Sequence, residues 1–187
     1  RAGTVWLAVH IGLEEYRAIK RISKRDADYD TFRREALVLK ELHHPGIPMI
    51  YDLEEDSEFF YLIEEYLEGY SLYALIVNQG PIQEAEAVRY GMQVCGLVAY
   101  MHSACEIPIL HLDLQPNNLI ICNGTVKLID FDHAAGCRWA NTAPKRFGTV
   151  GCAAPEQYAS DRMLDQRTDI YAIGAVLRFM TAGTLRE

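Results

Sequence analysis

The sequence predicts an α+β fold, in which a small antiparallel β-sheet with one helix is followed by a mainly helical part. Strand signals dominate before Leu67 and helix signals after it, with no repeat or low-complexity linker between them. The turn dipeptide Asn123-Gly124, set between two apolar runs, adds a β-hairpin to the second part. We therefore expect a first unit over residues 1–66 and a second unit over residues 67–187.

Four short runs rich in β-branched and aromatic residues predict the strands of the first unit. They cover residues 4–9, 16–21, 49–53 and 59–64. One helix interrupts these strands. Asp28 or Asp30 is expected to cap its start, and His44-Pro45-Gly46 stops it after about Leu42.

The helix of the first unit carries one apolar stripe, which indicates that one of its faces is buried. The stripe consists of Phe32, Ala36, Leu39 and Leu42. Glu35 borders this stripe. A carboxylate in such a place needs a cationic partner, because an unpaired charge is costly to bury. We therefore expect a basic side chain opposite Glu35.

After Leu67 the apolar residues follow a helical period. Helices are expected over residues 72–78, 83–103 and 168–180, with Gly183 as the C-cap of the last one. The buried face of the second of these helices is predicted to hold Ala85, Val88, Met92, Cys95, Val98 or Ala99, and Met101. The last helix has apolar residues on most sides, which predicts a central, buried helix.

The composition is that of an ordinary globular protein, with 50% apolar and 24% charged residues. The net charge of −8, from 18 basic and 26 acidic residues, argues against a nucleic-acid partner. No apolar run approaches the roughly 20 residues of a membrane helix. The 5 cysteines form no C-x-x-C pair, so we expect reduced core thiols without a disulfide or a metal site. These features favour a cytoplasmic protein.

Polar residues stand at the open end of the predicted hairpin. Pairing outward from Asn123-Gly124 sets residue 118 opposite residue 129, so Asn118 and Asp130 emerge side by side. An amide oxygen beside a carboxylate suits Mg²⁺ on a nucleotide phosphate. Asp113, five residues before Asn118, is then close enough to receive the proton of a hydroxyl group.

Together with these residues, the chain resembles the catalytic domain of the eukaryotic-type serine/threonine protein kinases found in bacteria. No single motif carries the resemblance, which rests on the order and spacing of several. The matching residues are Gly3-Thr4-Val5, Ala18-Ile19-Lys20, Glu35, His111, Asp113, Asn118, Asp130-Phe131, Gly148-Thr149, Ala154-Pro155-Glu156, Asp169 and Gly174.

The resemblance implies a two-lobed protein kinase-like fold, with residues 1–66 in an N-terminal lobe and residues 67–187 in a C-terminal lobe. It also implies a chain truncated at both ends. The first strand and the first two glycines of the phosphate loop would precede Arg1, and the chain would stop just after the core helix at Glu187. A fragment of this extent can be inactive by itself.

The implied reaction is the transfer of the γ-phosphoryl group of ATP to a Ser or Thr hydroxyl of a protein substrate, with Mg²⁺ as cofactor. Lys20, held by Glu35, would grip the α and β phosphates. Asn118 and Asp130 would hold Mg²⁺. Asp113 would orient the hydroxyl group and accept its proton late in the transfer.

The resemblance also implies contacts with the rest of the nucleotide and with the substrate. Besides Lys20, Asn118 and Asp130, the residues expected at the nucleotide are Gly3, Val5, Ala18, Ile120, Glu65 and Leu67. Val5, Ala18 and Ile120 should sandwich the adenine ring, whose edge should meet the backbone between the lobes. Thr149 belongs to the segment that docks the substrate.

Three residues depart from the pattern of these kinases. Leu112 replaces an arginine that in many kinases grips a phosphate on the activation loop, so we expect activity without that phosphorylation. Gln115 replaces a lysine aimed at the γ-phosphate. Asp132 replaces the glycine of the D-F-G triplet and adds a carboxylate near the metal. His111 is expected to serve packing and hydrogen bonding.

Two other functions remain open at this point. The departures at Leu112, Gln115 and Asp132 are compatible with a pseudokinase, a scaffold that binds a nucleotide or a partner without efficient catalysis. The pattern H-x-D-x-x-x-x-N and the ending Asp130-Phe131-Asp132 also resemble small-molecule phosphotransferases of the aminoglycoside or choline kinase type. Those enzymes generally lack a segment like residues 148–156.

Overall fold

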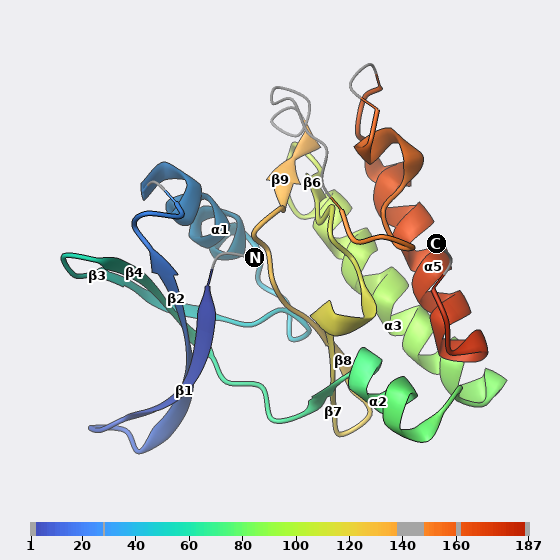
Figure 1. Cartoon of the computed structure of the whole chain (residues 1–187), viewed down its shortest axis with the longest axis horizontal. Coiled ribbons are helices and arrows are strands. Elements are labelled where there is room, and N and C mark those ends of the chain that lie inside the picture. Colours follow the sequence, from blue (N-terminus) through green and yellow to red (C-terminus); the bar gives the residue numbers. More distant parts are fainter. Residues whose placement is uncertain (1–2, 28, 138–147, 160–161, 186–187) are drawn as a thin grey trace.

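The computed structural model describes residues 3–27, 29–137, 148–159 and 162–185. A four-stranded antiparallel sheet with one helix is followed by a part that is mainly helical, as Figure 1 shows. The predicted α+β fold class is therefore confirmed. The boundary between units at residue 66 stays a prediction.

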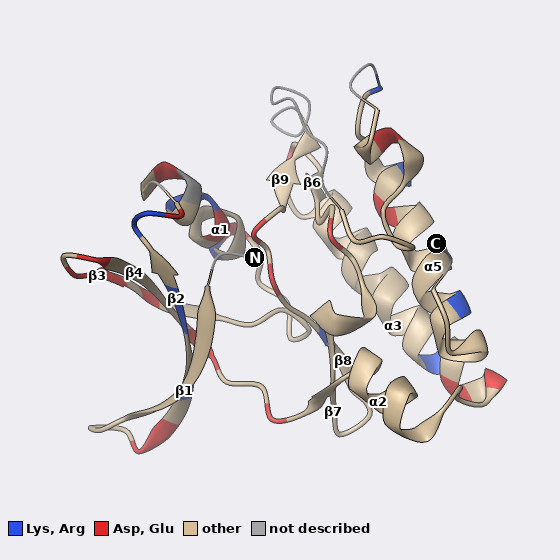
Figure 2. Ribbon diagram, viewed as in Figure 1, with Lys and Arg blue, Asp and Glu red and all other residues tan. Residues whose placement is uncertain are grey.

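The sheet of the first part contains β1 (Thr4–His10), β2 (Glu15–Ser23), β3 (Ile50–Glu55) and β4 (Phe59–Glu65). Its strand order is β1-β2-β4-β3, and all neighbouring strands are antiparallel. The four predicted strands are thus present, and no strand end differs from the predicted one by more than two residues. Acidic residues gather at the turn between β3 and β4, at the end of the sheet that lies away from α2, α3 and α5 (Figure 2).

Helix α1 (Tyr29–Glu41) lies against this sheet. The predicted apolar stripe is buried, and the ring of Phe32 stacks on Phe60 of β4 with ring centroids 4.9 Å apart. Asp30 falls inside the first turn and is not the cap. The other candidate cap, Asp28, lies outside the described residues.

The second part contains α2 (Leu72–Gln79), α3 (Glu84–Ser103) and α5 (Gln166–Ala182). Helix α2 begins where the Ser71 side chain accepts a hydrogen bond from the backbone N–H of Ala74, at 3.1 Å. Helix α5 ends at Gly183, whose φ of 75° closes the helix as predicted. Helices α3 and α5 pack side by side (Figure 1).

The predicted buried face of α3 is only partly correct. Val98 and Met101 are buried as predicted, but Val88 and Met92 are 53% and 71% exposed. The buried residues of this helix are Ala87, Tyr90, Gly91, Val94, Leu97, Val98 and Met101. Apolar residues occur on both sides of this helix, so periodicity could not choose between the sides.

The prediction that α5 is buried on most sides is also wrong. Ile170 and Tyr171 are 56% and 51% exposed. The buried face holds Thr168, Asp169, Ala172, Ile173, Val176, Phe179 and Met180. Helix α5 therefore covers α3 with one face and presents a second apolar face at the surface of the described residues.

Between the sheet and the helices lies the hairpin of β7 (Leu119–Cys122) and β8 (Thr125–Leu128). Its register pairs residue 122 with 125 and residue 120 with 127, as predicted. Asn123 and Gly124 have φ of 49° and 78°, and a two-residue turn of this kind requires positive φ at both positions. Short strand β5 (Tyr70–Ser71) joins β7.

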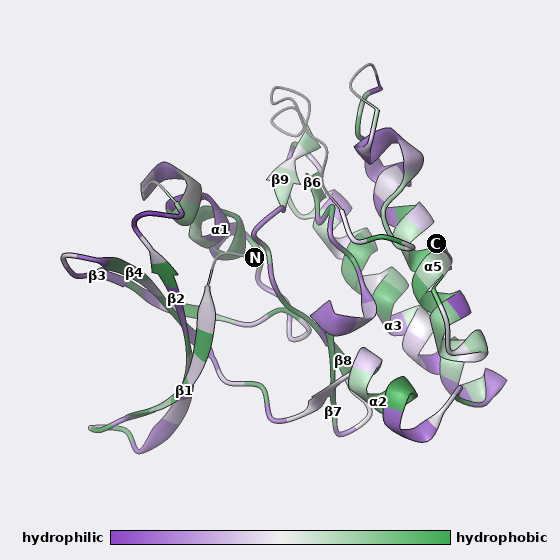
Figure 3. Cartoon of the chain, viewed as in Figure 1, coloured by the Kyte–Doolittle hydropathy of each residue, from purple (hydrophilic) through white to green (hydrophobic). Residues whose placement is uncertain are grey.

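Most buried apolar residues form one core that runs from α1 and the sheet through the hairpin to α3 and α5. Figure 3 shows hydrophobic residues on the hairpin and on α3. A second, small cluster consists of Leu110, Leu112, Ala135 and Leu164, with Cys137 packed against it. It joins β6 (Ile109–Leu110) to β9 (Ala135–Gly136).

The five cysteines form no disulfide bonds with one another. Only Cys152 is buried, whereas Cys95 is exposed, so the expectation that they are core thiols is wrong for Cys95. Among the described residues, no helix combines the length and the apolar character needed to cross a membrane.

Candidate active site

A cleft of about 350 Å³ lies between the sheet and the hairpin. This volume falls within the range of about 300–1,000 Å³ that is usual for small-molecule sites. The cleft is lined by Gly3, Val5, Ala18, Lys20, Glu35, Pro48, Glu64, Glu65, Tyr66, Leu67, Asn117, Asn118, Ile120, Ile129, Asp130 and Asp132. The structure therefore brings all the residues expected at the nucleotide into one cavity.

Lys20 and Glu35 form a buried ion pair at the back of the cleft. Lys20 points from β2 toward α1, and its Nζ donates to both carboxylate oxygens of Glu35 at 3.0 and 2.9 Å. The two side chains are only 10% and 5% exposed. The cationic partner expected for Glu35 is therefore Lys20. Each charge compensates the other, because burial of either one without a partner would be costly in free energy.

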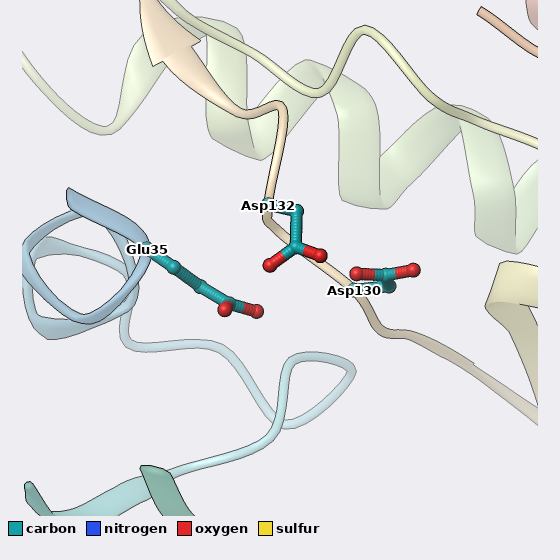
Figure 4. Close-up of side chains that lie close together, drawn as sticks. All are labelled: Glu35, Asp130 and Asp132. Carbon is teal, nitrogen blue, oxygen red and sulfur yellow. The ribbon is translucent and has the colours of Figure 1, made fainter. Parts of the chain in front are cut away.

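Two more carboxylates reach the same ammonium from the segment that follows β8. Lys20 Nζ lies 3.3 Å from Asp130 Oδ1 and also contacts Asp132 Oδ1. Oxygens of Glu35, Asp130 and Asp132 lie within 4.8 Å of one another (Figure 4). Asp132 was predicted to add a carboxylate near the metal, but its contact with Lys20 was not predicted.

The pKa values in this cluster reflect burial and crowding of carboxylates. Burial alone would lower the pKa of Lys20, but the charges of Glu35, Asp132 and Asp130 raise it above its ordinary value. Burial raises the pKa of Glu35, even beside Lys20. Glu64, on β4 at the cleft wall, has a pKa that burial raises to about 7. Burial therefore makes Glu35 and Glu64 hard to ionise, whereas contacts with Glu35 and Lys20 outweigh burial at Asp132 and lower its pKa.

The carboxylate of Asp113 is held by three side chains. Thr149 Oγ1 donates to Asp113 Oδ1 at 2.8 Å, and Gln115 Nε2 donates to Oδ2 at 2.9 Å. Asn118 Nδ2 donates to the backbone oxygen of Asp113 at 2.9 Å and to its Oδ2 at 3.3 Å. These donors fix the orientation of a carboxylate that is placed to accept a proton.

Asn118 and Asp130 lie next to each other, because the backbone N–H of Ile129 donates to the backbone oxygen of Asn118 at 2.9 Å. Asp130 has a φ of 64°, a strained conformation for a non-glycine residue of the kind found at functional sites. The Asn118 amide nitrogen is directed to Asp113, so its oxygen is the atom that would face a cation. An amide oxygen and a carboxylate fit Mg²⁺.

The outer part of the cleft has the apolar walls that a flat ring would need. Val5 and Ala18 come from β1 and β2, and Ile120 faces them from β7. Glu65 and Leu67, from the connection between the sheet and the helical part, also line the cleft. The backbone N–H of Glu65 donates a hydrogen bond to the backbone oxygen of Met49, at 2.8 Å.

Comparison with known proteins places this geometry in a family. The family model described as "Protein kinase domain" matches residues 1–186. The chain belongs to the protein kinase family. Similar proteins include the serine/threonine-protein kinase PrkC of Bacillus subtilis, 34% identical over 97% of this chain and 28% of that protein. Others are the putative sperm motility kinase W of Mus musculus, 32% identical over 97% of this chain and 36% of that protein, and the serine/threonine-protein kinase cds1 of Schizosaccharomyces pombe, 30% identical over 97% and 42%.

The chain spans about a third of the length of the curated kinases that it matches. Membership of the family explains the two-part fold with a cleft between the parts. The resemblance to eukaryotic-type serine/threonine kinases is confirmed at the level of the family and its relatives.

In this kinase domain, the loop that carries Asp113 is fastened to α5 by Asp169. The buried carboxylate of Asp169 accepts hydrogen bonds from the backbone N–H groups of His111 and Leu112, each at 3.0 Å, and lies 2.8 Å from His102 Nε2. Leu112 has a φ of 65°. Asp169 thus stabilises a strained turn directly before Asp113.

His111 is buried and packs edge-on against Phe131, with ring centroids 5.0 Å apart. Its Nε2 lies 3.3 Å from the backbone oxygen of Ile129. Burial lowers the pKa of His111, which favours the neutral ring. The expectation that this residue serves packing and hydrogen bonding agrees with these contacts.

The segment from residue 148 to residue 157 also contacts the loop that carries Asp113. Gln157 donates through Nε2 to the backbone oxygen of Leu112 at 2.7 Å and accepts through Oε1 from the N–H of Ala154 at 3.0 Å. Glu156 accepts a hydrogen bond from Thr168 Oγ1 at 2.9 Å. Sequence reasoning missed Gln157, because a single glutamine after A-P-E carries no recognisable signal.

Proposed function

We propose that the protein transfers the γ-phosphoryl group of ATP to Ser or Thr hydroxyls of protein substrates, with Mg²⁺ as cofactor. The observation that carries this proposal is that the Lys20–Glu35 pair, Asn118 and Asp130 line one cleft, and that Asn118 also donates hydrogen bonds to Asp113 beside this cleft. Phosphoryl transfer depends mainly on positioning and on charge neutralisation, and these residues supply both.

Each residue has a role that follows from its contacts. Lys20, held by Glu35, would pair with the α and β phosphates. Asp113 would orient the incoming hydroxyl and take its proton, since its carboxylate is fixed on both oxygens by Thr149 and Gln115. Thr149 is thereby a positioning residue that links the substrate-docking segment to the base.

Asn118 and Asp130 would hold Mg²⁺, which would supply positive charge to the phosphate oxygens when bound. The donor set of one amide oxygen and one carboxylate fits this ion. The adenine ring would lie between Val5, Ala18 and Ile120, with Gly3 over the phosphates and the backbone of Glu65 and Leu67 at the ring edge.

A protein substrate is favoured over a small alcohol by the segment from residue 148 to residue 157. Through Thr149 and Gln157, this segment contacts the loop that carries Asp113. Small-molecule phosphotransferases generally lack such a segment. We include in the proposal a lobe boundary between residues 66 and 67, a cytoplasmic location in line with cysteines that form no disulfide, and a role in bacterial signalling.

The test is transfer of labelled phosphate from ATP by the intact protein, with a generic protein substrate in one reaction and amino-sugars and small alcohols in another. We expect labelling of Ser or Thr in the protein substrate only. Asp113→Asn should reduce the rate by at least about a hundredfold, the size of a general-base contribution. Binding of ATP without any transfer would favour a scaffold, and labelling of the small molecules would favour the other enzyme class.

A further inference from the structure

The charge balance of the cleft is unfavourable for an anionic ligand. Its lining contains one basic residue, Lys20, against five acidic residues, which are Glu35, Glu64, Glu65, Asp130 and Asp132. A nucleotide carries several negative charges on its phosphates. Even with Glu64 only partly ionised near neutral pH, the acidic groups of the cleft outnumber Lys20, so an anion is repelled unless positive charge is added.

The single ammonium group in this lining is fully engaged. Lysine has three N–H donors, and Lys20 Nζ contacts the carboxylates of three different residues, Glu35, Asp130 and Asp132. A phosphate oxygen can reach this ammonium only if one of these carboxylates gives way.

Asp132 is the partner best placed to give way. Its side chain is 29% exposed, whereas those of Asp130 and Glu35 are 21% and 5% exposed. Glu35 also receives two hydrogen bonds from Lys20. Asp132 lies on the segment between β8 and β9, and its carboxylate points toward Glu35 across the cleft (Figure 4). A carboxylate that leaves Lys20 in this position needs another cation, because it stays among negative charges.

We propose that Asp132 makes nucleotide binding dependent on a divalent cation, because its carboxylate neutralises Lys20 until a cation compensates it. This inference rests on the proposed function of the cleft. It assigns to Asp132 a positioning role: the residue acts on the nucleotide through Lys20. A side chain without charge at this position would leave Lys20 available to the phosphates even without the cation.

The test measures the affinity of the intact protein for ATP by calorimetry, once with EDTA and once with MgCl₂. The quantity of interest is the ratio of the two dissociation constants. In Asp132→Asn and Asp132→Gly, this ratio should be at least about tenfold smaller than in the wild type, mainly through tighter binding in EDTA, as expected when one repelling charge leaves a partly desolvated site. Glu54→Gln, which removes an exposed charge outside the cleft lining, should leave the ratio unchanged.

An unchanged or larger ratio in the Asp132 variants would overturn the inference. Asp132→Asn keeps the shape of the side chain, so it decides the question if Asp132→Gly does not fold, as judged from thermal unfolding without nucleotide. Failure of the proposed function is a different result: the wild type would then bind no ATP in either solution and transfer no phosphate, which removes the basis of the inference as well.

Discussion

Asp169 is the residue on which the loop before Asp113 depends most. Its buried carboxylate accepts from two backbone N–H groups, those of His111 and Leu112, and contacts His102. A buried N–H without a partner costs free energy, because in the unfolded chain it is bonded to water. The strained φ of Leu112 would then have no compensating hydrogen bond.

We therefore predict that Asp169→Ala lowers the free energy of unfolding by about 2–6 kcal/mol, the sum expected for two unsatisfied buried donors. Denaturant unfolding followed by circular dichroism measures this change. Asp26→Ala, at an exposed turn, is the matched control and should change stability by less than about 0.5 kcal/mol. Equal stabilities of the two variants would contradict the prediction.

Glu64 makes stability depend on pH. Burial raises its pKa from 4.5 to about 7 in the folded protein, so the folded protein binds more protons than the unfolded chain between these values. The free energy of unfolding contributed by this group therefore falls as the pH rises from 4.5 to 7.

Glu64→Gln should accordingly stabilise the protein at pH 8 by about 1–3 kcal/mol and have little effect at pH 5. Denaturant unfolding of both proteins at the two pH values measures the difference, with Glu54→Gln as an exposed control. The same change at both pH values would show that the effect of the substitution is not ionic.

At the level of single residues, the sequence was sufficient for side chains that belong to ordered motifs. Lys20, Glu35, Asp113, Asn118 and Asp130 could be proposed together because each restricts the identity of the others. Three-dimensional contacts that no motif records could not be predicted in this way. The hydrogen bonds of Gln157 and the high pKa of Glu64 depend on burial by segments that are distant in the sequence.

Among the secondary-structure elements, the contact between β5 and β7 depends on a glycine. A Cβ atom at Gly69 would overlap the backbone oxygen of Ile121, the residue that pairs with Tyr70. The backbone of β7 cannot move away without disturbing the hairpin register. A Cβ atom at Gly96, on the exposed face of α3, would meet nothing within 4 Å.

Two alanine substitutions should therefore have opposite effects. Gly69→Ala should lower the free energy of unfolding by about 1–3 kcal/mol through overpacking against backbone. Gly96→Ala should raise it by about 0.5–1 kcal/mol, because alanine favours the helix. Thermal or denaturant unfolding of both variants measures the effects, and a destabilised Gly96→Ala would disprove the second.

The existence of the elements was easier to predict than their buried faces. Helix α1 has a single apolar stripe, so its buried side was correctly predicted. Helices α3 and α5 carry apolar residues on two sides, and the side that is buried is decided by their packing on each other. The hairpin was predictable to the residue, because the turn dipeptide fixes its register.

At the scale of the whole molecule, the small apolar cluster around Leu112 stands where many kinases have an arginine that binds a phosphate on the activation loop. Leu112 lies buried with Leu110, Ala135 and Leu164, in the place of an arginine that would grip a phosphate. The segments on both sides of residues 138–147 are thus held by apolar contacts at Ala135 and Leu164. Such contacts do not need phosphorylation.

We predict that transfer by the intact protein does not depend on phosphorylation of its activation loop. Phosphate transfer rates of phosphatase-treated and untreated protein should agree within about twofold, since the ordering contact is hydrophobic rather than charge-assisted. Mass spectrometry of the treated protein verifies removal of phosphate. A collapse of the rate after treatment would show that a phosphate has another cationic partner.

The arrangement of Lys20 also determines how an inactive variant of this protein should be chosen. Replacing the lysine by methionine would leave three acids, Glu35, Asp130 and Asp132, beside one another in the cleft without their shared cation. Such a protein would lose both the contact between α1 and the segment after β8 and any contact with phosphate. A loss of activity could therefore come from a changed structure rather than from the missing catalytic group. Asp113→Asn leaves that attachment intact and is the cleaner inactive reference.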